Sequence, residues 1–269
     1  GANAIDKGII LPETQNHLNY DISNSMFSNE SDPCDYQYGL SGTLSLMIGF
    51  AIGFPPLWDI ESGNSRIGVF GLMDQGSNNG RGLVPSPPDP WTRIYAGWEV
   101  PTIIDNNSEI SLPKVSKNNI ARVNINESEY FLIENRVNHF RKGVSLDSIR
   151  FKMWEETDTY PSFIRILKDS VEVEQDDNGV ITKIPNYDIG LPGSGLLIWH
   201  IDDNRIQQGI DDYSINKLVS RPGIDLEEAD GAQDIGQQSF FMFNDPSSGY
   251  FGDMWFAENE EHYRANPQN

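Results

Sequence analysis

The chain has 269 residues, of which 19 are Lys or Arg and 40 are Asp or Glu, so its formal net charge at pH 7 is −21. This charge argues against a nucleic-acid ligand and an anionic membrane surface, since both attract proteins through Lys and Arg. Hydrophobic residues make up 38% of the chain and aromatic residues 11%, enough for a sizeable core in one large domain or two smaller ones.

The first 40 residues are polar and interrupted by Asn and Pro, which predicts mainly loop. Cys34 is the single cysteine, so an internal disulfide is excluded. His17 has no partner at a metal-ligand spacing, which favours a structural or exposed histidine. The sequence starts at Gly1 and contains neither a signal peptide nor a transmembrane run, and we expect it to be part of a longer chain.

Residues 41–59 predict a helix that ends in a turn. An apolar run with no polar face is typical of a helix buried inside a larger protein, and this run is shorter than the ~20 residues that cross a bilayer. Gly53 suits a helix C-cap, and Pro55 and Pro56 prevent the helix from continuing. The apolar residues are Leu44, Leu46, Met47, Ile48, Phe50, Ala51 and Ile52.

The segment Gly-Phe-Pro-Pro-Leu-Trp-Asp at 53–59 resembles the end of the active-site motif of the immune inhibitor A family of secreted metallopeptidases, H-E-x-x-H-x-x-G-[LF]-P-D-L-[YW]-D. In this register Leu46 and Phe50 stand at the two histidines and Met47 at the glutamate. Pro56 stands at the aspartate that the resemblance implies as a further zinc ligand. Two His at i and i+4 hold zinc and the Glu acts as general base, so the replacements predict a site without zinc.

Two further segments resemble the same family. Residues 68–76 are similar to G-x-W-D-L-M-x-x-G, so Met73 stands where the resemblance implies a turn below the metal; a core methionine is the simpler interpretation. Residues 87–101 are similar to a family helix, with Asp89 as N-cap and Pro90 as first helical residue. Its apolar stripe predicts a core-facing helix and consists of Trp91, Ile94, Tyr95 and Trp98.

After residue 102 the pattern changes to alternation and short apolar runs, which predict strands at 110–113, 121–126, 129–136 and 195–201. Residues 171–184 predict a hairpin that turns at Asn178-Gly179. The segments 129–136, 191–203 and 221–231 again resemble family motifs, in the family order. Glu134 and Arg136 share one face of their strand and are expected to pair with neighbouring strands, an interaction of little stabilising value if exposed.

The four histidines, His17, His139, His200 and His262, show no H-x-x-x-H or H-x-x-E-H spacing. His200, near the end of a predicted buried strand, is therefore expected to be structural. The aromatic segment after Asp234 is expected to pack on the strands.

Two acidic clusters suggest a calcium site, because Ca²⁺ takes 6–8 oxygen ligands in irregular geometry. A solvated acidic surface is the simpler alternative in a chain of net charge −21. The candidate ligands are Asp202, Asp203, Asp225, Glu227, Glu228, Asp230 and Asp234.

Together the patterns predict an α+β fold. The resemblance implies that residues 1–101 form the C-terminal part of a zincin-like domain with a buried former active-site helix, and that 102–269 form a mainly antiparallel, β-rich domain packed on it. It implies a catalytically inactive binding or structural module of a secreted or cell-surface protein, with a protein partner or self-association. The alternatives are an active extracellular metallopeptidase with atypical ligands and a subunit of an extracellular assembly.

Overall fold

The computed structural model describes residues 40–80, 82, 84–105, 109–113, 119–138, 172–177, 181–184, 187–237 and 248–256. The expectations for residues 1–39, for His139 and His262, and for the Asn178-Gly179 turn lie outside these residues.

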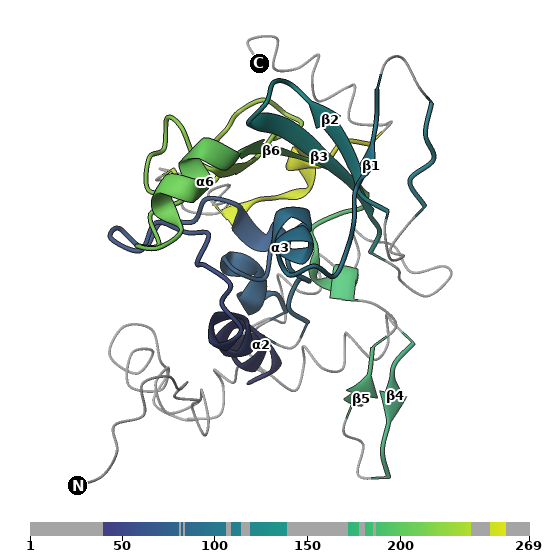
Figure 1. Ribbon diagram of the computed structural model, residues 1–269. Coiled ribbons are helices and arrows are strands. Elements are labelled where there is room, and N and C mark those ends of the chain that lie inside the picture. The colour runs from purple at the N-terminus through teal and green to yellow at the C-terminus, as the bar shows by residue number, and fades with distance from the viewer. Residues whose placement is uncertain are drawn as a thin grey trace, which may run out of the picture.

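A five-stranded sheet forms the centre of the fold, with strands in the order β1-β2-β3-β6-β7 (Figure 1). The β1–β2 pair is parallel and the other three pairs are antiparallel, so the predicted mainly antiparallel sheet is confirmed. The strands are β1 (Thr102–Ile103), β2 (Ala121–Asn124), β3 (Glu129–Arg136), β6 (Gly195–Asp202) and β7 (Ile224–Leu226).

The two long central strands set the register of the sheet. β3 alternates half-buried and buried residues along its whole length, as a strand with one face on a core must. In the β3–β6 pair Leu132 lies opposite Trp199 and Tyr130 opposite Ile201, so the buried faces of both strands coincide. The predicted strands at 121–126, 129–136 and 195–201 are therefore confirmed to within two residues at their ends.

A separate two-stranded sheet pairs β4 (Glu174–Gln175) antiparallel with β5 (Ile181–Lys183), so the strand pairing of the predicted hairpin is confirmed. The strand predicted at 110–113 is wrong, because these residues form no strand. They are largely exposed, and the Leu112 carbonyl accepts a hydrogen bond from the Asn135 side chain at 2.9 Å instead of joining a ladder. A short apolar run without a neighbouring strand edge leaves its backbone groups to side chains and water.

The helices are short; α3 lies beside the sheet, and α2 lies farther from it, against η2 (Figure 1). They comprise α2 (Leu40–Ala51), α3 (Pro90–Tyr95) and α6 (Asp203–Gly209), with the 3₁₀ turns η1 (Gly68–Phe70), η2 (Gln75–Asn78), η3 (Tyr187–Gly190) and η5 (Phe251–Asp253). None of the described helices is long and apolar enough to cross a membrane.

The predicted end of α2 is confirmed by its hydrogen bonds. Gly53 has φ +97°, its N–H donates to Phe50 O at 3.0 Å, and the Phe54 N–H donates to Gly49 O at 2.9 Å. These two bonds form a Schellman motif, in which a glycine adopts the left-handed conformation without strain.

The expectation that α2 is buried is wrong. Only Gly42 and Gly49 are buried, whereas Ile48 is 51% and Ile52 54% exposed. The helix contacts η2 and the segment around Met73 through its glycine face, because small residues allow the closest approach of two backbones. When a helix has apolar residues on every face, its sequence does not show which face will pack against the rest of the protein and which will stay exposed.

The helix at α3 begins as predicted. Asp89 is its N-cap, and the Asp89 carboxylate accepts hydrogen bonds from Thr92 N at 3.0 Å and Thr92 Oγ1 at 2.5 Å. The expectation that its whole aromatic stripe is core is wrong, because only Trp91 is buried, while Tyr95 and Trp98 are about half exposed. α3 ends at Tyr95, so Trp98 lies beyond the helix.

One hydrophobic core draws on both halves of the sequence. It runs from residues before the sheet, through β3, β6 and β7, to Met254 near the last described residue. Phe256, after η5, packs against this core, as expected for the aromatic segment after Asp234, of which residues 238–247 lie outside the described residues. Its largest fully buried side chains are Trp199, Phe70, Leu57, Ile67, Met73, Ile120, Leu132, Leu197, Ile201, Ile215, Ile224 and Leu226.

Candidate metal centre

The positions on α2 that correspond to zinc ligands in the resembling family hold almost no donor atoms. Leu46 and Phe50 are half-buried and pack against the core, and the Phe50 ring contacts the edge of Trp58 with centroids 5.8 Å apart. Met47 is half-buried and offers only a thioether sulfur, and Pro56 is buried and offers no side-chain donor. Zinc takes imidazole, thiolate and carboxylate ligands, so these four residues do not fit a zinc ion.

Met73 lies directly below α2. It is fully buried, and a Cβ atom added to Gly49 would meet Met73 Sδ at 2.8 Å. Met73 is therefore a core residue that packs against Gly49 of α2, and the turn below a metal that the resemblance implied stays a prediction.

The structure separates the acidic residues that the sequence grouped together. Asp202 is a helix cap: its Oδ1 accepts a hydrogen bond from Arg205 N at 3.1 Å, while its Oδ2 lies 2.8 Å from Arg221 Nη2. Asp203 accepts a hydrogen bond from the Tyr130 hydroxyl at 3.0 Å. Both carboxylates are therefore occupied by protein donors away from the other candidates.

Asp225 lies in β7 and Glu227 directly follows it. Neither belongs to the buried group of Glu228, Asp230 and Asp253. Burial, and next the charge of Glu227, raise the pKa of Asp225 to about 7. Asp234 lies close to this group, since its backbone N–H donates to Glu228 Oε2 at 2.8 Å.

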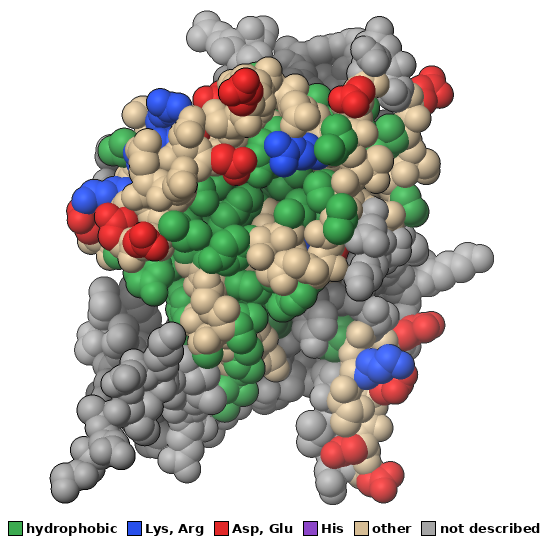
Figure 2. Space-filling model, viewed as in Figure 1, with side chains coloured by type: hydrophobic (Ala, Val, Ile, Leu, Met, Phe, Trp, Pro, Cys, Tyr) green, Lys and Arg blue, Asp and Glu red, His purple; other side chains and the backbone are tan. Residues whose placement is uncertain are grey.

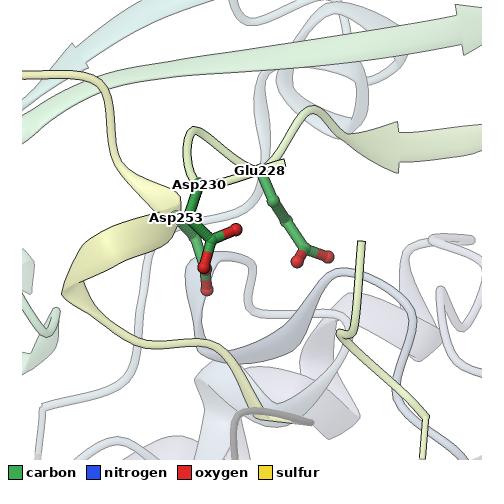
Figure 3. Close-up of side chains that lie close together, drawn as sticks. All are labelled: Glu228, Asp230 and Asp253. Atoms are coloured by element: carbon green, nitrogen blue, oxygen red, sulfur yellow. The ribbon is translucent and has the colours of Figure 1, made fainter. Parts of the chain in front are cut away.

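Glu228, Asp230 and Asp253 form a compact buried group (Figure 3). Each contributes a carboxylate oxygen, and these oxygens all lie within 4.8 Å of one another. The side chains come from two segments, the loop after β7 and the 3₁₀ turn η5, and the residues are 5%, 4% and 0% exposed. Among the residues that the structure describes, no other three His, Cys, Asp or Glu side chains come together in this way.

Backbone amides hold the first two carboxylates in place. Glu228 accepts hydrogen bonds from Asp234 N at 2.8 Å and from Ile235 N at 3.0 Å. Asp230 accepts one from Ala232 N at 2.9 Å. Each carboxylate oxygen has two lone pairs, so these bonds leave capacity for a further ligand.

Tyr250 joins Asp230 to Asp253, because its hydroxyl donates to Asp230 Oδ2 and its backbone N–H donates to Asp253 Oδ2 at 2.8 Å. The other oxygen of Asp253, Oδ1, is buried and has no hydrogen-bond partner within the described part of the chain.

Burial and neighbouring negative charges raise the pKa values of Asp253 and Glu228. Burial is the main cause that raises the pKa of Asp253 to about 8, followed by the charges of Glu228, Asp230 and Asp234. Burial likewise raises the pKa of Glu228 to about 7, with the charges of Asp234 and Asp230 adding to it. Both carboxyl groups therefore hold protons more tightly than an exposed carboxyl group does.

The sequence grouping included Glu228 and Asp230 but missed Asp253. Asp253 stands alone among glycine and apolar residues, so no local pattern marks it, and only the fold brings it to the loop after β7. The one described histidine, His200, is half-exposed, tilts over the Phe131 ring and lies 3.9 Å from Glu129, consistent with a structural role.

Comparison with protein-family models, with curated proteins and with solved structures found no match for this chain.

Proposed function

We propose that this chain is a non-catalytic, metallopeptidase-like module of the immune inhibitor A type, and that it acts as a protein-binding or structural part of a secreted or cell-surface protein. The observation that carries the proposal is the composition of α2: Leu46 and Phe50 share a helix face at the i, i+4 spacing of a zinc-binding helix, but present only carbon.

The arrangement of the family-like segments supports this proposal. Each of them contributes to the single core, and one residue from each of five segments illustrates this: Leu57, Met73, Trp91, Leu132 and Trp199 are all buried in it. Segments that resemble one family in order, and that also pack together, are consistent with a fold that has kept its packing while losing its ligands. Fold and activity are separate properties, so loss of the second is compatible with the first.

Exposed apolar side chains around α2 favour a protein-binding role. Ile48 on α2 and Ile52, which follows the last residue of α2, are exposed. Trp98, 47% exposed, reaches this region through an edge contact with Phe54 at 5.3 Å between centroids. Figure 2 shows hydrophobic side chains gathered over α2 and beside α3, with the charged side chains lying elsewhere on this face. Contiguous apolar surface of this kind marks protein contacts, so the partner that we infer is a protein with its own apolar surface.

The catalytic part of the proposal is tested by elemental analysis and a digest. Purified chain, incubated with one equivalent of ZnCl₂ and passed through a desalting column, should retain no stoichiometric zinc and should not cleave casein. Zinc retained at one atom per chain, together with cleavage that EDTA abolishes, would overturn the proposal in favour of an active metallopeptidase with ligands elsewhere.

The binding part is tested by sedimentation velocity of the wild type and of the double variant Ile48→Asp/Ile52→Asp. The matched control is Val219→Asp, which changes an exposed apolar residue at 60% exposure away from α2. If the wild type and the control sediment as an oligomer and the double variant sediments as a monomer, the chain assembles with itself through α2. A monomer in all three cases points to a different protein as the partner.

A further inference from the structure

We propose that Glu228, Asp230 and Asp253 bind one divalent cation, with Ca²⁺ preferred over Mg²⁺ and Zn²⁺, and that the ion fastens η5 to the loop after β7. This inference is independent of the lost zinc site on α2 and of the protein partner.

The geometry is that of a shared coordination sphere. Ca²⁺–oxygen distances are about 2.3–2.6 Å, so two oxygens on opposite sides of one ion are at most about 5 Å apart. One carboxylate oxygen from each of the three residues lies within 4.8 Å of the other two, and Figure 3 shows the three side chains next to one another. One ion can therefore contact all three without a large movement of the backbone.

Asp253 supplies an independent reason to expect a ligand. It is 0% exposed, and its Oδ1 atom has no hydrogen-bond partner among the described residues, although Oδ2 accepts from the Tyr250 N–H. Buried carboxylate oxygens are normally satisfied by donors or ions, because an unsatisfied one loses its hydration without compensation. A cation between the three carboxylates would satisfy this oxygen.

The charge balance points the same way. No Lys or Arg within the described ranges forms an ion pair with Glu228 or Asp253. Buried charges in proteins are paired or coordinate metals, and a divalent cation would offset two of the three negative charges.

The donor set selects the ion. All three side chains are carboxylates, and hard oxygen donors suit Ca²⁺, Mg²⁺ and Mn²⁺, whereas Zn²⁺ favours nitrogen and sulfur. Mg²⁺ requires a near-ideal octahedron at about 2.0–2.1 Å, while Ca²⁺ accepts irregular sites with additional carbonyl or water ligands. Carboxylates held by an irregular loop and a short 3₁₀ turn favour Ca²⁺, the ion that tolerates irregular geometry.

The ion would reinforce contacts that already join the two segments. The Ala229 N–H donates to Asp253 O at 3.0 Å, and the Trp255 indole N–H donates to Glu227 O at 2.9 Å. Trp255 also bridges to Leu196 at the start of β6. A cation at the acidic group therefore ties residues 248–256 to the central sheet, and the stability of that attachment should depend on its concentration.

The probes are CaCl₂, MgCl₂ and TbCl₃ on the purified chain. Tb³⁺ replaces Ca²⁺ in oxygen sites and emits when a nearby aromatic ring absorbs; Tyr250, hydrogen-bonded to Asp230, is suitably placed. We expect emission that saturates at one Tb³⁺ per chain. Ca²⁺ should displace the Tb³⁺ at a concentration at least tenfold lower than the Mg²⁺ concentration that does so. We also expect the thermal midpoint in millimolar CaCl₂ to exceed that in EGTA by about 5 °C.

The diagnostic variant is Asp253→Asn, which keeps the shape of the side chain and removes its charge. It should bind Tb³⁺ at least tenfold more weakly and lose the calcium response. In EGTA it should melt at or above the wild-type midpoint, because an amide has no charge to bury beside Glu228 and Asp230. The matched control Glu227→Gln removes a charge from the same loop, outside the proposed ligand set, and should stay within threefold of the wild type.

Two results would overturn the proposal. The first is a wild-type chain with no saturable Tb³⁺ emission and the same midpoint in CaCl₂ and EGTA, a result that does not depend on whether any variant folds. The second is a calcium response that Asp253→Asn retains in full, which would place the ion elsewhere.

Discussion

Arg136 Nη2 lies 2.6 Å from Asp188 Oδ1, and both side chains are almost completely buried. Arg136 also contacts Glu134 Oε1 at 3.2 Å, and Arg93 contacts the other Glu134 oxygen at 2.7 Å. Burial raises the pKa of Glu134, but Arg93 and Arg136 outweigh it and hold this pKa below its usual value. The sequence led us to expect a pairing of Glu134 and Arg136 with other strands; the structure shows a buried network that ties β3 to η3 and α3.

Removing one member of this network should be costly. Asp188→Ala leaves the Arg136 guanidinium buried beside a single carboxylate, and we expect a loss of about 3–5 kcal/mol in the free energy of unfolding. Urea denaturation followed by tryptophan fluorescence measures it. The control Lys183→Met breaks the exposed Lys183–Glu174 pair and should change stability by less than about 1 kcal/mol. Equal effects of the two variants would show that burial does not govern these pairs.

Asp225 should make stability depend on pH. Its pKa in the folded state is about 7, whereas the pKa of an aspartate in an unfolded chain is about 3.9. Between these values the folded state binds a proton that the unfolded state does not, so stability falls as pH rises through the window and then levels off. In EGTA, Asp225→Asn should reduce the fall between pH 4 and 8 by up to about 4 kcal/mol, the equivalent of about three pKa units. The exposed control Asp211→Asn should leave the profile unchanged; a wild-type slope in Asp225→Asn would contradict the assignment.

Restoring the family's ligands on α2 should harm the fold. The triple variant Leu46→His/Met47→Glu/Phe50→His places polar groups at three half-buried positions, two of which, Leu46 and Phe50, pack against the core. The cost is about 1–3 kcal/mol for each group left unpaired. We expect a lower thermal midpoint and no zinc-dependent casein cleavage. Ile48→His, on the exposed side of the same helix, should change the midpoint little. Recovered hydrolysis would mean that the site has been preserved around the missing ligands.

Gly42 should be intolerant of any side chain. A Cβ atom there would lie 1.8 Å from the Ser77 carbonyl oxygen, so Gly42→Ala must separate α2 from η2. Alanine improves helix propensity by about 1 kcal/mol, yet we expect a net loss of about 2 kcal/mol or more. The neighbouring exposed Ser41→Ala tests the propensity effect without the clash. If both variants gain stability in a thermal melt, the close approach of α2 to η2 is wrong.

Local chemistry made part of this fold predictable. Gly53 ends α2 because only a residue without Cβ adopts its φ easily, and Asp89 starts α3 because its carboxylate reaches a free backbone N–H. The alternation at 129–136 became a strand because a half-buried strand repeats every two residues. These signals act between residues close in the chain, and the sequence therefore determined them by itself.

Tertiary contacts decided the rest. The exposure of Ile48 and Ile52, and the absence of a strand at 110–113, depend on which neighbours each segment meets. The acidic group is the clearest case. Seven acidic residues looked alike in sequence, but Asp202 became a helix cap paired with Arg221, whereas Asp253, unmarked by any pattern, joined Glu228 and Asp230. Whether a carboxylate caps a helix, pairs with a cation or lies among other carboxylates depends on which groups from distant segments lie near it. Those distances in space cannot be derived from residue spacing along the chain.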